Sequence, residues 1–313
     1  MRLSAYVVLL LCCLNVSLPA QRDTAYVELF DNQARINTGL RYRESSLTIS
    51  APSRDELHLE STGLSFRIGG RFKRVSYTFS LPLSDLGTGT DERESEKFGL
   101  GLTLFLRRQL VSGRFRRIRG FRAVTAGGTG TFREDVELIT ATVFGYHVLN
   151  HEKFSLRAGF RQRDRQLKSQ GSFLIGGLAD RQILTTDEKF IPFADGRDKW
   201  ISRLAQTKFG VGVGYAYTFT FGNHFFVTPF ALVGPEIRFL SVNDANGGRR
   251  ERESVRISPR VRGYLAVGWN GERTAAAITV HHLPSFDVSD NLTTRREHLT
   301  VELRITRRLF YPD

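Results

Sequence analysis

The stretch from Phe209 to Gly234 restricts the fold more than any other part of the sequence. From Phe209 to Phe221, bulky apolar residues occupy every second position, and glycine, alanine or threonine stands between them. Successive side chains of a β-strand point to opposite faces, so this period of two predicts a strand with one bulky apolar face. An average strand has about 5–6 residues, whereas a tilted strand crosses a bilayer in about 9–11. The length therefore favours a membrane-spanning strand over a core strand of a soluble β-sandwich.

Similar alternation recurs along the chain, and Gly222-Asn223 predicts a tight hairpin turn after this strand. The predicted strands cover residues 34–49, 64–69, 75–81, 98–107, 110–121, 136–148, 153–177, 209–221, 224–234, 255–269, 274–282 and 299–310. Outer-membrane barrels place short turns on the periplasmic side and long loops outside. Every connection follows that rule if residues 153–177 form a single strand, and both chain ends then lie in the periplasm. The sequence thus predicts an all-β fold, a transmembrane antiparallel β-barrel of about 12 strands.

The N-terminal segment 1–20 has the features of a signal peptide. Arg2 supplies the positive charge, residues 5–16 form the apolar core, and cleavage is expected after Ala20. The expected organisation is a signal peptide at 1–20, a periplasmic leader at 21–33 and an outer-membrane β-barrel at 34–313. Cys12 and Cys13 leave with the signal peptide, so the mature chain would have no disulfide, cysteine–zinc site or cysteine nucleophile.

The chain is strongly basic, with a formal net charge of +13, and loss of Arg2 leaves 13 − 1 = +12. Such a charge on a soluble protein would suggest nucleic-acid binding, but export to the outer membrane argues against nucleic acid. The expected partners are outer-membrane lipid, the phosphates of lipopolysaccharide and an anionic solute. The aromatic end of the last strand, Phe310 and Tyr311, resembles the assembly signal of bacterial outer-membrane barrels. That resemblance implies the barrel assembly machinery as a further partner.

Residues 150–177 carry a family-like motif, NHEKFSLRAGFRQRDRQLKSQGSFLIGG. Its second half contains Lys168, Ser169, Gly171, Ser172 and Phe173 at the matching positions. Together with IRGF at 118–121 and GYAY at 214–217, this stretch resembles a family of uncharacterised outer-membrane barrels from Bacteroidota, the domain of unknown function numbered four thousand four hundred and twenty-one. The resemblance implies a Gram-negative outer-membrane barrel. The family has no established activity, so the resemblance assigns no functional residue.

The sequence offers no convincing catalytic or metal-binding pattern. A lipid-modifying barrel enzyme would need a serine and a histidine within hydrogen-bond reach on the barrel wall, and no predicted strand carries His-x-Ser. His281 and His282 lack further ligands at metal-binding spacing. Ser169 and Ser172 are three residues apart and would face opposite sides of a strand. We therefore expect a protein that is not an enzyme and that has neither cofactor nor metal.

Several arginines are predicted to face the barrel interior. They are Arg157 and Arg161 on strand 153–177, Arg256, Arg260 and Arg262 on strand 255–269, and Arg304 and Arg308 on strand 299–310. The clearest inward acids are Glu137 and Glu302. Buried charge without a partner is costly, so two interpretations stay open. The lumen is a wet pore whose lining favours anions, or the arginines pair with loop acids such as Asp195, Asp198 or Glu251 and plug a closed barrel.

A further basic run between Arg107 and Arg122 predicts either a phosphate-binding patch or a solvated strand extension. The function expected from the sequence is that of a non-enzymatic outer-membrane barrel, either structural or a small anion-preferring pore. The alternatives are a lipid-modifying outer-membrane barrel enzyme and a soluble exported β-sandwich that binds anionic ligands.

Overall fold

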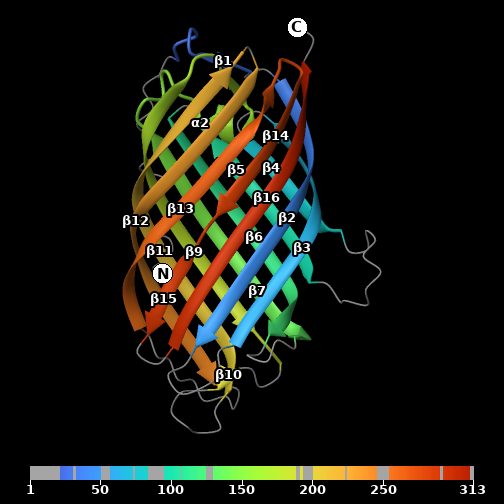
Figure 1. The fold of residues 1–313 in the computed structure, drawn as a ribbon, viewed down its shortest axis with the longest axis vertical. Helices are drawn as coiled ribbons and strands as arrows, with labels where there is room; N and C mark the ends of the chain where they lie inside the picture. Colours follow the sequence, from blue (N-terminus) through green and yellow to red (C-terminus); the bar gives the residue numbers. More distant parts are fainter. Residues whose placement is uncertain are drawn as a thin grey trace.

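The computed structural model describes residues 22–30, 33–50, 57–72, 75–83, 95–106, 108–124, 130–187, 191–192, 200–222, 224–244, 254–289 and 292–310. Twelve antiparallel strands form one closed β-barrel, drawn in Figure 1 with its long axis vertical. In order around the barrel they are β2 (Gln33–Ser50), β3 (Leu57–Phe72), β4 (Val75–Pro82), β5 (Glu96–Phe105), β6 (Gln109–Val124), β7 (Gly130–Val148), β9 (Gln170–Thr185), β11 (Trp200–Phe221), β12 (Phe225–Asp244), β13 (Ser254–Asn270), β14 (Thr274–His282) and β16 (Leu292–Phe310). The wall closes because β16 pairs with β2.

The two ends of the barrel differ. The upper end in Figure 1, here called the short-turn end, carries the brief connections β3–β4, β5–β6, β11–β12 and β13–β14. The opposite, long-loop end carries the short extra strands β10 (Ile191–Pro192) and β15 (Ser285–Ser289), which pair with β11 and β16. There β3 pairs directly with β6, Leu59 lying opposite Ala123. The wall is thus two strands narrower at that level, because β4 and β5 stop short of it.

The outer face of the barrel is an apolar belt, as the alternation predicts. On β5, Leu102 is 51% exposed whereas its neighbour Thr103 is 6% exposed. Val211 on β11 is likewise exposed, and on β12 Phe225 faces outward while Phe226 is buried. A closed antiparallel barrel with such a belt is the architecture of outer-membrane barrels. The chain is therefore an outer-membrane β-barrel, and the predicted fold class is confirmed.

The strand predicted for residues 153–177 is wrong. Within it, Leu156–Arg161 forms the helix α2, the short strand β8 (Asp164–Gln166) follows, and the seventh barrel strand is β9. Six residues are too few for a period of two to exclude a helix. Ser155 caps the helix, since its Oγ accepts a hydrogen bond from the backbone N of Ala158 at 3.3 Å. Among the described residues, no helix is long and apolar enough to cross a membrane.

The segment containing α2 fills the lumen at the short-turn end (Figure 1). Residues 149–169 lead from β7 to β9 and fold back inside the wall, where β8 pairs with β1 (Val27–Leu29). Phe154 and Leu156 are fully buried against inward aromatic side chains of the barrel, among them Phe230 and Tyr264. Residues 149–169 together with β1 are called the plug below. The plug begins and ends at the same end of the barrel. The predicted number of strands, and the predicted placing of short turns at one end and long loops at the other, are therefore unchanged.

Candidate functional site

A cavity inside the barrel is lined by charged side chains from the wall and the plug. Its empty space is about 850 Å³. Seven arginines line it: Arg41 and Arg43 on β2, Arg67 on β3, Arg114 and Arg116 on β6, Arg161 on α2 and Arg304 on β16. Among the described residues that line this cavity, Glu302 is the single carboxylate. The cavity is called the basic chamber below.

Glu302 shares its carboxylate among three arginines. Its Oε2 accepts a hydrogen bond from Arg41 Nη2 at 2.9 Å, its Oε1 accepts one from Arg304 Nε at 2.8 Å, and Oε1 also pairs with Arg67. The Glu302 side chain is 3% exposed. The three neighbouring strands β16, β2 and β3 bring these side chains together, because alternate residues of each strand face inward. Three cations here meet one anion.

Three other arginines of the basic chamber have no carboxylate partner among the described residues, namely Arg43, Arg114 and Arg161. Arg43 is 5% exposed, and its Nε has no hydrogen-bond partner. Arg114 lies over the ring of Phe144, with its Cζ 4.7 Å from the ring centroid. The chamber therefore holds more positive charge than its own acids neutralise.

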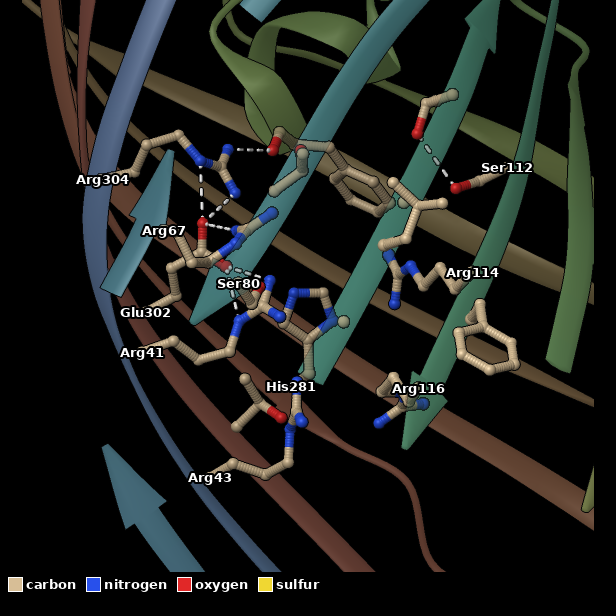
Figure 2. Close-up of a pocket in the computed structure, with 18 of the residues that line it drawn as sticks. Arg41, Arg43, Arg67, Ser80, Ser112, Arg114, Arg116, His281, Glu302 and Arg304 are labelled. Atoms are coloured by element: carbon tan, nitrogen blue, oxygen red, sulfur yellow. Dashed lines mark hydrogen bonds and ion pairs between the residues drawn. The ribbon is translucent and has the colours of Figure 1, made fainter. Parts of the chain in front are cut away.

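Figure 2 shows the arrangement of these side chains. Arg43, Arg114 and Arg116 extend from opposite sides of the chamber toward a common space beside His281. The His281 ring lies against that of Tyr264, with centroids 4.4 Å apart. The chamber thus presents several guanidinium donors and one imidazole to the same volume.

The arginines predicted on strands β13 and β16 all occupy inward positions. Arg260 lies 3.9 Å from Glu236 Oε2 through its Nε, and Arg262 donates to the hydroxyl of Tyr146. Arg256 alternates with outward, exposed residues of β13. Arg304 and Arg308 are both buried. Of these five, Arg304 lines the basic chamber itself.

Arg157 and Arg161 lie on α2 and not on a barrel strand, which corrects the sequence prediction. Arg161 lines the basic chamber at its plug side. Arg157 lies within the plug and pairs with Asp164 through its Nη2 at 2.7 Å. The two side chains thus have different surroundings, although residues four apart lie on one face of a helix.

Asp164 links the parts of the plug to one another. Its carboxylate accepts hydrogen bonds from Arg22 Nη1 at 2.8 Å, from Arg157 Nε at 2.8 Å and from Ser155 Oγ at 2.5 Å. Complete burial would raise the pKa of Asp164, but the ion pairs with Arg157 and Arg22 outweigh burial and hold that pKa well below its ordinary value. Asp164 is therefore a carboxylate that ties the N-terminal segment to the helix.

The wall holds the plug mainly through backbone carbonyl oxygens. Arg304 Nη1 donates to Phe160 O at 3.0 Å, and Arg35 Nη1 donates to Gln162 O at 2.8 Å. The loop acids considered from the sequence, Asp195, Asp198 and Glu251, lie outside the described residues. Inward arginines therefore do more than line the lumen. Through the described contacts, these arginines also hold the plug in position.

Two of the cavities that adjoin the basic chamber extend it along the barrel. One lies beside the plug, shares Arg161 and Arg304 with the chamber, and is also lined by Arg35, Arg71 and Arg163. The other has an empty space of about 980 Å³, shares Arg114 and Arg116 with the chamber, and is also lined by Asp180, Lys208, Glu236 and Arg238. The three spaces follow one another from the plug toward the long-loop end. Inward leucines gather at the long-loop end of this series: Leu47, Leu59, Leu138, Leu184, Leu204 and Leu240.

The family-like motif marks the junction between the plug and β9. Ser169 Oγ accepts a hydrogen bond from the backbone N of Thr220 at 2.9 Å, and Ser172 Oγ accepts one from Asn150 N at 2.9 Å. Gly171 O accepts from Asn150 Nδ2 at 3.0 Å.

The remaining motif residues flank this junction. Lys168 Nζ lies 5.1 Å from the ring centroid of Tyr26. Phe173 is exposed on the outer face against Tyr215, with ring centroids 5.0 Å apart. The motif residues thus have structural contacts with the backbone and with the lipid-facing surface.

The remaining sequence predictions about charge are partly wrong. Glu137 faces outward and pairs with Arg117, because it lies between the inward residues Val136 and Leu138 on β7. The basic run divides by the alternation of β6: Arg114 and Arg116 line the basic chamber, and Arg117 faces outward. The sequence prediction of site residues does not include the inward arginines Arg41, Arg43 and Arg67. Their alternation with apolar residues in the first two strands is the signal that could identify them.

Hydroxyl and imidazole groups meet at two places that sequence spacing does not reveal. Ser45 Oγ lies 2.7 Å from His298 Nδ1, although the two residues are 253 positions apart. Thr48 Oγ1 lies 2.8 Å from His58 Nδ1, and His58 Nε2 lies 2.8 Å from Glu60 Oε1. Within the described part of the chain, no three His, Cys, Asp or Glu side chains are grouped so as to hold a metal ion.

Comparisons with known proteins give a family and a loose likeness in fold. Residues 21–306 match the model of a family described as "Domain of unknown function (DUF4421)". No significant match was found among curated proteins.

Three solved outer-membrane proteins illustrate the likeness in fold. They are the outer membrane protease OmpT from Escherichia coli (6% identity, TM-score 0.43, 90% of this chain and 98% of that chain covered), the beta domain of the Bordetella autotransporter BrkA (11%, 0.38, 86% and 98%) and an outer membrane channel from Pseudomonas putida F1 (10%, 0.40, 90% and 97%). These likenesses are too loose to carry any role to this chain.

Proposed function

The chain belongs to the family described as a domain of unknown function (DUF4421), which has no stated activity, and we therefore propose a function from the structure of the lumen. The chain is a plugged, anion-preferring pore and not an enzyme. The charge of the basic chamber carries the proposal, because seven arginines meet one carboxylate among the described lining residues. Rings of arginine or lysine select anions in pores, since a positive lining attracts anions and repels cations.

The arrangement of the cavities supports a route along the barrel axis. The basic chamber shares lining residues with the space beside the plug on one side. On the other side it shares lining residues with the space toward the long-loop end. The plug supports a closed resting state, because Phe154 and Asp164 are completely buried within it. Opening would require α2 to move away from the wall.

Planar bilayers that contain the purified protein in a salt gradient test the proposal. We expect brief openings whose reversal potential shows anion preference. Arg304→Glu places an acid in the chamber and removes the hydrogen bond to Phe160 O, so it should increase the open time and weaken the anion preference. Arg307→Glu makes the same change on the exposed, opposite face of β16 and should alter neither. Cation preference of the wild type, silence of both proteins, or equal effects of the two substitutions would contradict the pore.

A second candidate function, hydrolysis of a lipid ester, is favoured by the hydrogen-bonded series Thr48, His58 and Glu60. A hydroxyl beside an imidazole that a carboxylate orients is an arrangement that activates a nucleophile. These side chains lie on the outer face of β2 and β3, because the adjacent Leu47 and Leu59 point inward. Fatty-acid release from phospholipid vesicles that disappears in His58→Gln would support this function. Release that His58→Gln leaves unchanged would exclude this site.

A further inference from the structure

Glu302, the single carboxylate among the described lining residues of the basic chamber, is fully engaged, and some of the arginines have no carboxylate partner. Both oxygens of Glu302 are occupied by Arg41, Arg67 and Arg304. In the part of the chain that the structure describes, no other carboxylate lines the chamber. The positive charge of Arg43 and Arg114 is therefore not neutralised by the chamber itself.

The left-over arginines lie where isolated charge is unfavourable. A guanidinium group keeps its proton in proteins, and burial without a partner is strongly destabilising. Arg43 is 5% exposed with an unpartnered Nε. Arg43, Arg114 and Arg161 belong to β2, β6 and α2, so three separate elements direct like charges into one space. An anion within that space would convert their repulsion into attraction.

We propose that the basic chamber binds a multiply charged phosphate oxyanion, either free or carried on a monoester, among Arg43, Arg114 and Arg161. More than one uncompensated arginine calls for more than one negative charge on the ligand. Guanidinium groups donate paired hydrogen bonds that match the oxygens of phosphate, which a halide ion cannot use in this way. In Figure 2, Arg43 and Arg114 approach the common space from different sides, as a tetrahedral group requires.

Neutral groups of the chamber fit the rest of such a ligand. Ser80, Ser112 and Thr300 line the same cavity and supply hydroxyl groups. The rings of Phe160 and Tyr264 also line the cavity, with their centroids 4.1 Å apart. This inference names the ligand class of the proposed anion-accepting lumen, but it does not depend on conduction.

Calorimetric titration of the full mature chain in a zwitterionic detergent tests the site. The probes are inorganic phosphate, glucose 1-phosphate and acetate at equal ionic strength and about pH 8, where phosphate groups are dianions. Both phosphates should bind at least about tenfold more tightly than acetate, a difference of about 1.4 kcal/mol. Tighter binding of the ester would assign the organic part, and equal binding would assign free phosphate. Arg43→Gln and Arg114→Gln should each weaken the binding of phosphate about tenfold. Arg117→Gln, on the outward face of β6, should leave binding unchanged.

Thermal unfolding without any anion separates a ligand site from a purely structural role. Removal of a repelling charge should make Arg114→Gln unfold at a higher temperature than the wild type. Added phosphate should raise the unfolding temperature of the wild type more than that of Arg114→Gln. Equal binding of acetate and phosphate, or a lower unfolding temperature for Arg114→Gln, would overturn the site. Phosphate binding by a barrel that never conducts would refute the pore and support the phosphate site. Anion conduction without phosphate binding would support the pore and refute the phosphate site.

Discussion

Arg308 donates a hydrogen bond from Nη2 to the backbone carbonyl oxygen of Gln162 at 2.7 Å, which joins the last barrel strand to the end of α2. Gln162 caps the helix in a left-handed conformation, with φ of 49°. Arg35 Nη1 on β2 donates to the same carbonyl at 2.8 Å. The carbonyl groups at a helix C-terminus carry partial negative charge and attract cations. Two neighbouring strands thus hold the plug through one peptide group.

Arg308→Met should loosen the plug without unfolding the barrel. The change removes the hydrogen bonds to Gln162 O and to Asn270 Oδ1 and the contact with the Phe30 ring. A hydrogen bond to a charged group contributes about 1.5–3 kcal/mol. Trypsin should therefore cleave within residues 149–169 faster in the folded variant than in the wild type.

Arg307→Met is the matched control for that experiment, because its side chain is exposed on the opposite face of β16. Its cleavage rate should equal that of the wild type. If Arg308→Met is cleaved no faster, or is cleaved only after the barrel has unfolded, the role of Arg308 as a tether of the plug is wrong.

The pH dependence of plug closure should follow Asp164. Its ion pairs hold its pKa in the folded protein below the ordinary value, which is about 3.9 in an unfolded chain. Its contribution to stability is therefore complete above that value and is lost only as the pH falls through the lower folded pKa. Bilayer conductance should stay flat from about pH 8 to about pH 4.

Asp164→Asn provides the comparison, because Arg22 and Arg157 then lose their buried anion. Loss of one partner of a buried ion pair costs about 3–5 kcal/mol, so this variant should conduct more than the wild type throughout that range. Glu297→Gln, which removes a half-exposed acid on the outer face, should conduct no more than the wild type. A wild-type conductance that rises steeply near pH 6 would show that another group controls closure.

The barrel could be predicted from the sequence because its signal is local. The alternation of Leu102 with Thr103 indicates which face of the strand meets lipid. This prediction requires no knowledge of contacts with distant residues. The same rule failed at residues 156–161, where a short alternating run also fits a helix. Contacts with Asp164 and with the barrel wall decide between the two. The contact between Ser155 and Asp164 spans nine residues, and the wall residue Arg304 is 144 residues away from Phe160.

The basic chamber could not be predicted in the same way. Arg43, Arg114 and Arg161 each look like an ordinary polar residue of a strand, and only closure of the barrel brings them to one cavity. The parity of Arg43 and Arg114 within their strands does predict that these two face inward, whereas Arg161 lies on α2. It does not predict that Glu302 is shared by three other arginines, since that depends on side-chain reach across β16, β2 and β3.

Gly234 on β12 should resist substitution because β11 passes close to it. A Cβ atom at this position would overlap Val211 O and would lie 2.5 Å from Gly212 Cα. Gly234→Ala should therefore push the two strands apart and lower the free energy of unfolding in urea by about 1–3 kcal/mol. Gly113→Ala on β6, where a Cβ meets nothing within 4 Å, should be neutral. Equal stability of the two variants would contradict the close approach of β11 and β12.

Leu102→Arg should impair assembly of the barrel in the outer membrane. The side chain is 51% exposed on the outward face of β5, within the apolar belt. An arginine on the lipid face costs about 2–4 kcal/mol at the bilayer midplane and about 0–1 kcal/mol near the interfaces. The amount of folded protein in outer membranes, identified by its altered electrophoretic mobility before heating, should fall. The control is Glu96→Arg, on the same outward face of β5 but at its long-loop end, and it should assemble like the wild type. Equal assembly of both variants would mean that Leu102 does not face lipid, and equal failure would mean that the belt extends to Glu96.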